Sequence, residues 1–106
     1  MATAQTSTYW VKIYIAGPIA VAKQIIRREA KQQGLCVTIE PTTYVYTGGE
    51  ELGYVVGFIN YPRFPAEPSS IWARAEKLAE VLKTETYQSS YTIMDPTQSV
   101  WVSDRE

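Results

Sequence analysis

The sequence predicts one α+β domain in which an antiparallel sheet carries two helices on one face. The chain has 106 residues, which suits a single hydrophobic core. Hydrophobic residues make up 45% of the chain and charged residues 20%, a composition typical of globular proteins. Segments with alternating apolar residues enclose two segments whose apolar residues recur at helical spacing. We therefore expect one domain over residues 1–106, with residues 1–8 as a disordered polar tail.

The first element is a strand over residues 9–15, because its side chains alternate in polarity as a half-buried strand requires. One side of this strand holds Val11, Ile13 and Ile15. The other side holds Trp10, Lys12 and Tyr14. We expect the aliphatic side to face the helices.

A helix follows the break at Gly17-Pro18, since proline is well tolerated in the first turn of a helix. Its apolar stripe comprises Ile19, Ala22, Ile26 and Ala30. Its opposite stripe comprises Lys23, Arg27 and Lys31. Gly34 is the expected end of the helix, because glycine readily adopts the left-handed conformation of a helix terminus.

Two more strands are expected over residues 35–47 and 54–61. Pro41 interrupts the earlier segment, which favours an edge strand or a bulge. The glycine-rich segment 48–53 is predicted to turn the chain, so that residues 54–61 run back antiparallel.

The second helix is predicted after the proline-containing loop, with Ser69 or Ser70 as its N-cap. Its apolar positions are Ile71, Ala75, Leu78 and Leu82. Residues 91–94 and 100–102 then flank a turn at 95–98 and predict a closing hairpin. The order β-α-β-β-α-β with a short extra C-terminal strand resembles the ferredoxin-like pattern, which hosts unrelated functions and so implies none.

Composition removes several kinds of chemistry. There is no His and only one Cys, which argues against His-based acid/base catalysis, Cys/His catalysis and nearly all zinc sites. A net charge of −1 lacks the basic excess of a dedicated nucleic-acid binder. No apolar run is long enough to span a bilayer. We expect a cytosolic protein without catalytic residues, cofactor, metal or membrane contact.

The open face of the sheet is predicted to be aromatic. If Val55, Gly57 and Ile59 are buried, the strand over 54–61 leaves its other side uncovered beside the first strand. The predicted open-face residues of the first strand are Trp10, Lys12 and Tyr14, and those of the strand over 54–61 are Tyr54, Val56, Phe58 and Asn60. Soluble monomers seldom leave an apolar patch of this size exposed to solvent, so we expect another molecule or segment to cover this face. A protein partner or second copy ranks first, a segment of the same chain second and single-stranded nucleic acid third. For the third cover, the aromatic positions resemble the stacking platform of RNA-recognition motifs.

Three further groups are candidate contacts. The cationic ridge of Lys23, Arg27 and Lys31 is either a solvated helix face or a surface for an acidic partner. Glu50 and Glu51 are expected at an exposed hairpin tip, with an acidic contact loop as their functional interpretation. Arg63, between Pro62 and Phe64, suits recognition of a carboxylate or packing over its own sheet.

The segment Lys12-Ile13-Tyr14-Ile15-Ala16-Gly17-Pro18 is similar to the strand-one opening of nucleoside deoxyribosyltransferases. That resemblance implies an anion or nucleotide held by free N–H groups at the Gly17-Pro18 turn. A turn that serves packing alone is the other interpretation, and the one we favour.

Together these patterns predict a small non-catalytic protein-binding module, acting as a homodimer or as a virus-encoded inhibitor of a host complex. The alternative is a binder of a small ligand, nucleotide or single-stranded nucleic acid that uses the aromatic face and the glycine loops. An enzyme ranks third.

Overall fold

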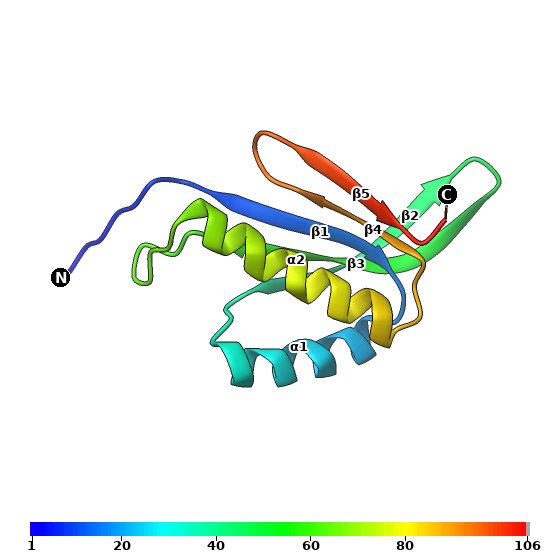
Figure 1. Cartoon of the computed structure of the whole chain (residues 1–106), viewed down its shortest axis with the longest axis horizontal. Helices are drawn as coiled ribbons and strands as arrows, with labels where there is room; N and C mark the ends of the chain where they lie inside the picture. The colour runs from blue at the N-terminus through cyan, green and yellow to red at the C-terminus, as the bar shows by residue number, and fades with distance from the viewer. Residues whose placement is uncertain (106) are drawn as a thin grey trace.

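A computed structural model describes residues 1–105 and contains one sheet with two helices packed on one face (Figure 1). In chain order the elements are β1 (Trp10–Ala16), α1 (Ile19–Gln33), β2 (Thr38–Tyr46), β3 (Gly49–Ile59), α2 (Pro68–Glu85), β4 (Ser90–Met94) and β5 (Ser99–Ser103). The strand order is β2-β3-β1-β4-β5, and every neighbouring pair is antiparallel. Neither helix has the length and apolar character needed to cross a membrane.

The predicted α+β class, with an antiparallel sheet and two helices, is confirmed. The complete strand order is that of a five-stranded sheet and differs from the four-stranded ferredoxin-like order. β5 pairs with β4 and forms an additional edge of the sheet.

The core lies between the helices and the aliphatic side of β1. Val11, Ile13 and Ile15 are almost completely buried, as predicted for the first strand. From α2, Leu78 and Leu82 pack into the same cluster. Burial of these side chains is the main favourable contribution to folding.

The predicted facing of β3 is wrong. Tyr54 and Phe58 are 0% and 4% exposed and belong to the helix-side core, whereas Ile59 is 48% exposed. Because side chains alternate along a strand, a shift of one position exchanges the two faces completely. The aromatic rings bury more surface than Val55 and Gly57 would, so they take the side that the helices cover.

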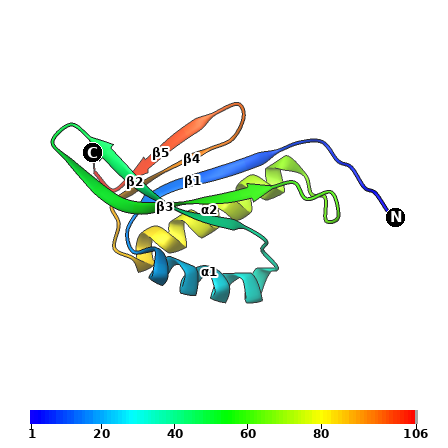
Figure 2. The same ribbon diagram turned by 180° about the vertical axis from the view of Figure 1, so that it is seen from behind.

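The hairpin formed by β2 and β3 is tighter and longer than predicted. Its turn lies at Thr47-Gly48, where Gly48 has a φ of 92°, and β3 starts directly afterwards. Glu50 and Glu51 therefore lie within a strand and not at a hairpin tip. Pro41 lies in β2 at the edge of the sheet, as predicted. The hairpin extends beyond the helices at one end of the molecule (Figure 2).

The helix ends agree only partly with the sequence prediction. Gly34 ends α1 in the left-handed conformation, and its N–H donates to the carbonyl of Ala30. The predicted serine cap of α2 is wrong, because Glu67 takes the cap position and Pro68 begins the helix. The chain thus uses the fixed φ of proline at this helix start, with no side-chain cap.

Candidate functional site

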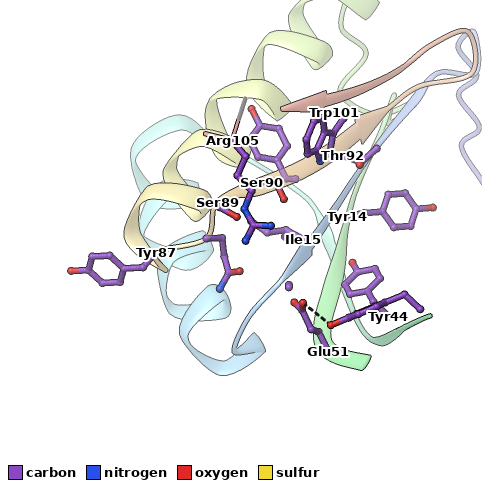
Figure 3. A pocket seen from close by; sticks show the side chains of 14 residues that line it. Tyr14, Ile15, Tyr44, Glu51, Tyr87, Ser89, Ser90, Thr92, Trp101 and Arg105 are labelled. Atoms are coloured by element: carbon purple, nitrogen blue, oxygen red, sulfur yellow. Dashed lines mark hydrogen bonds between the residues drawn. The ribbon is translucent and has the colours of Figure 1, made fainter. Parts of the chain in front are cut away.

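A hollow of about 590 Å³ lies at the end of the sheet where β1 finishes (Figure 3). We call it the sheet-end pocket. It is lined by Tyr14, Ile15, Ala16, Tyr44, Tyr46, Glu51, Tyr87, Gln88, Ser89, Ser90, Tyr91, Thr92, Trp101 and Arg105. The lining comes from all five strands and their flanking segments, so the pocket forms only when the whole sheet is assembled.

Aromatic rings form much of the pocket lining. Tyr14 projects from the open face of β1, and Trp101 lies on β5 next to Thr92 of β4. Tyr44 reaches the pocket from β2, and its hydroxyl donates to the carbonyl oxygen of Tyr54 at 2.8 Å. Burial raises the pKa of Tyr44, so its hydroxyl stays protonated as a donor at neutral pH.

Gly53 allows the Tyr44 ring to pack against the sheet. A Cβ atom at residue 53 would lie 2.5 Å from Cε2 of Tyr44 and 2.5 Å from the carbonyl oxygen of Ile15. Neither distance is compatible with a side chain. The aromatic wall therefore depends on the absence of a side chain at this point of β3.

Glu51 is the carboxylate of the pocket. The hydroxyl of Tyr46 donates to its Oε1 at 3.2 Å, an interaction drawn in Figure 3. Burial, and then the hydrogen bond to Glu51, raise the pKa of Tyr46. Glu50 precedes Glu51 on the strand and does not line the pocket. Glu50 and Glu51, which the sequence presents as one acidic pair, therefore lie on opposite faces of β3.

The segment that joins α2 to β4 forms another side of the pocket. Tyr87 adopts a φ of 58°, the left-handed region that non-glycine residues seldom occupy. Next to it, Gln88 packs so close to Gly17 that a Cβ on Gly17 would lie 3.1 Å from its Nε2. The segment thus lies against the end of β1, and Gln88, Ser89 and Ser90 belong to the pocket lining.

The Gly17-Pro18 turn contributes one of its N–H groups to a contact within the protein. The N–H of Gly17 donates to the carbonyl oxygen of Leu52 at 3.1 Å. The adjoining hollow is lined mainly by apolar groups, including Pro18, Pro41 and Leu52. These contacts agree with a packing turn and use a donor that the nucleotide interpretation requires.

The structure brings only two of the sequence-predicted site residues into the pocket, Tyr14 and Glu51. Trp10 and Lys12 lie further along β1, where the Lys12 ammonium is 5.3 Å from the Trp10 ring centre. The remaining residues do not line the pocket: Tyr54 and Phe58 are in the core, Lys23, Arg27 and Lys31 are on α1, Glu50 is on β3, and Arg63 stacks near Phe64.

Sequence reasoning missed most of the lining. Tyr44 and Tyr46 are two positions apart on β2, and this spacing could have placed both on one face. The polar run 86–90 between a helix and a strand was a second available signal. The closing hairpin that carries Trp101 was predicted and is confirmed by the pairing of β4 with β5. Its place beside β1, which brings Trp101 and Arg105 to the pocket, depends on the order of the whole sheet.

No family model matches the chain, and no curated protein matches its sequence. Two solved structures share its fold. A phage SAM lyase in complex with S-methyl-5'-thioadenosine is 15% identical, with a TM-score of 0.71 and coverage of 97% of this chain and 95% of that one. A phage SAM lyase in the apo state is 15% identical, with a TM-score of 0.68 and coverage of 92% and 90%.

These neighbours correct the functional prediction. Both are enzymes that share the fold over almost their whole length. They contradict the predicted non-catalytic protein-binding module and the predicted absence of enzyme activity. The alternative expectation of a small-ligand or nucleotide binder agrees better with them.

Proposed function

We propose that this chain is a phage enzyme of the SAM lyase type, whose sheet-end pocket binds SAM and S-methyl-5'-thioadenosine. One observation carries the proposal: an aromatic pocket with a single carboxylate lies in a fold that phage SAM lyases share. Its volume of about 590 Å³ is within the range of small-molecule sites.

The lining suits the two parts of SAM, S-adenosylmethionine. Its adenine offers a flat ring for stacking on aromatic side chains such as Tyr14, Tyr44 and Trp101. Its sulfur is a sulfonium cation, which is attracted both by aromatic faces and by a carboxylate. Glu51 is the carboxylate within the described lining and lies beside Tyr46.

The proposed cleavage needs no proton transfer. An oxygen of SAM's own carboxylate forms a bond to Cγ of the amino-acid arm while the bond from Cγ to sulfur breaks. The electron pair of that bond stays on sulfur, which leaves as the neutral thioether S-methyl-5'-thioadenosine, and the remainder closes into an amino lactone. Because a neutral leaving group needs no general acid, a chain without His can supply all that this route requires: orientation and removal of water.

Glu51 has a binding role in this scheme. Its charge attracts the sulfonium of the substrate, and that attraction weakens as the sulfur becomes neutral. An interaction that is stronger in the ground state lowers KM without raising kcat. Replacing Glu51 should therefore raise KM for SAM without lowering kcat.

The test is incubation of the purified protein with SAM and quantification of S-methyl-5'-thioadenosine and the lactone by mass spectrometry. We expect equal amounts of both products, formed faster than in SAM solution without protein. Glu51→Gln should raise KM about tenfold, which corresponds to about 1.4 kcal/mol. Glu50→Gln is the matched control, because it removes the same charge one residue away and outside the pocket lining. Cleavage no faster than in the protein-free solution would overturn the proposal.

For the fold, we also propose that β2, β3, β1 and β4 with both helices form a ferredoxin-like unit to which β5 is added. The antiparallel pairing of β1 with both β3 and β4 supports this assignment.

A further inference from the structure

The end of the chain forms a short strap across the end of the sheet. After β5, the N–H of Asp104 donates to the carbonyl oxygen of Ser89 at 2.8 Å. The carboxylate of Asp104 pairs with the ammonium of Lys83 at 2.8 Å, and the Lys83 side chain is 10% exposed. One residue later, the N–H of Arg105 donates to Oγ of Ser103 at 2.9 Å. The strap, residues 103–105, is thus fixed to the C-terminal turn of α2 and to the segment before β4.

This strap places Arg105 in the sheet-end pocket. In Figure 3 the Arg105 side chain extends toward the centre of the pocket beside Ser89 and Ser90, while Glu51 enters from β3. Within the described lining, these two residues carry the formal charges, one of each sign. Among residues 1–105, no carboxylate forms an ion pair with the Arg105 guanidinium.

The separated charges of Arg105 and Glu51 are complementary to the carboxylate and the sulfonium on the amino-acid arm of SAM. That arm carries a carboxylate, an ammonium and the sulfonium, whereas S-methyl-5'-thioadenosine has lost the arm and is neutral. A guanidinium binds a carboxylate through two parallel N–H donors, which fixes its orientation as well as its position. Recognition of the carboxylate would therefore favour the substrate over the product.

We propose that Arg105 is the carboxylate-binding residue of the pocket and that the Lys83–Asp104 ion pair positions it. This inference rests on the proposed function and deepens it, because it assigns the preference for a ligand with an amino-acid arm to one side chain. Lys83 does not line the pocket, so its role is exerted only through the strap. After cleavage the carboxylate is part of the lactone and has lost its charge, so the contact with Arg105 no longer retains the products.

The test compares two ligands that differ in the arm. S-adenosylhomocysteine has the carboxylate but no sulfonium, and S-methyl-5'-thioadenosine has neither. Isothermal titration calorimetry gives Kd for both ligands with the unaltered protein, Arg105→Gln and Arg105→Lys. We expect Arg105→Gln to raise Kd for S-adenosylhomocysteine about tenfold or more. Kd for S-methyl-5'-thioadenosine should change less than about twofold. Arg105→Lys should restore part of the loss. Arg63→Gln is the matched control, because Arg63 is outside the pocket lining, and it should change neither Kd.

Two further variants test whether the Lys83–Asp104 ion pair positions Arg105. Lys83→Met and Asp104→Asn each remove the ion pair, and both should reproduce the selective loss of S-adenosylhomocysteine without weakening S-methyl-5'-thioadenosine. Asp104 is exposed, so Asp104→Asn keeps the test valid if Lys83→Met fails to fold. A merely structural role would weaken both ligands together.

The outcomes separate the two proposals. If the unaltered protein binds neither ligand and does not cleave SAM, the proposed function fails and this inference fails with it. If it binds S-methyl-5'-thioadenosine but Arg105→Gln raises Kd for both ligands equally, or changes neither Kd, only the role of Arg105 is overturned. If Arg105→Gln is selective and Asp104→Asn has no effect, the positioning role alone is overturned.

Discussion

The two faces of the sheet show how the same strands serve two purposes. The face toward the helices is filled by side chains that exclude water, such as Ile13, Tyr54 and Phe58. The other face carries Tyr14 and, toward the end of β1, a pocket that holds hydroxyls and one charge of each sign. On the covered face, burial alone decides which side chains fit. On the pocket side, polar groups from distant parts of the chain must meet at one place, and this requires the complete topology.

The largest expected effect is loss of stability on the covered face. Phe58→Ala should lower the free energy of unfolding by about 3–5 kcal/mol, because it removes a buried ring and leaves a cavity. Ile59→Ala is the matched control: it is the next residue on β3, is 48% exposed, and should cost less than about 1 kcal/mol. Urea unfolding followed by circular dichroism measures both, and Phe58→Leu serves if the alanine variant does not fold. Similar losses at residues 58 and 59 would contradict the observed facing of β3.

This contrast also explains which part of the fold the sequence could predict. On β1 the aliphatic side alternates with Lys12, so only one side fits a core. On β3 the run from Tyr54 to Ile59 is apolar on both sides, and alternation alone cannot choose between them. The choice depends on ring volume and on the space under the helices, which are properties of the packed structure.

The site was less predictable for a similar reason. The sequence predicts Tyr14 and Glu51 as contact residues for a protein partner, and it places Glu51 at an exposed hairpin tip because the glycine pair suggests a longer turn. Ser89 and Arg105 meet only through the strap and the pairing of β4 with β5. The absence of His argues against an enzyme only for reactions that need a proton donor or acceptor. A sulfonium leaving group needs neither.

The second largest effect is expected at Gly53 of β3, which packs against both the backbone of β1 and the Tyr44 ring of the pocket. Gly53→Ala places a Cβ 2.5 Å from the backbone oxygen of Ile15 and should lower the free energy of unfolding by about 1–3 kcal/mol. It should also displace the Tyr44 ring and so weaken binding of the proposed ligand, S-methyl-5'-thioadenosine, in the sheet-end pocket. At Gly57, a Cβ would meet only the hydroxyl of Thr38, at 2.6 Å, and this side chain can rotate away. Gly57→Ala should therefore change stability by less than about 1 kcal/mol. Equal losses in the two variants, by thermal and urea unfolding, would show that the backbone contact at Gly53 is not decisive.

A smaller effect, of opposite sign, is expected at Tyr54. Its hydroxyl is buried and, within residues 1–105, has no hydrogen-bond partner. Tyr54→Phe should raise the free energy of unfolding by about 1 kcal/mol at pH 7, because it removes an unsatisfied buried group.

The same substitution has a pH signature. Burial raises the pKa of Tyr54 to about 12, above the ordinary value near 10. The folded state therefore holds this proton more tightly, and stability falls as pH rises from about 10 through about 12. Tyr54→Phe should lose less stability over that interval, so its advantage over the unaltered protein should grow. Urea titrations at pH 7, 10 and 11 measure the difference. A constant or shrinking advantage would mean that the Tyr54 hydroxyl is accessible to water.

The smallest effect on folding is expected on α1, on the side away from the core. Lys23, Arg27 and Lys31 form the cationic ridge, and none of the three belongs to the buried cluster. Reversing all three to Glu should leave the net change in the free energy of unfolding below about 1 kcal/mol, because surface substitutions usually change it by no more than about 0.5 kcal/mol each, in either direction. The ridge remains a predicted contact for an acidic surface or for a second copy of the chain. Any such association should weaken with salt, because screening shortens electrostatic reach to about 8 Å at physiological ionic strength. Sedimentation velocity at low and high salt tests this. Loss of salt-sensitive association in the triple variant would support the ridge as a contact, whereas unchanged association would assign it to solvent.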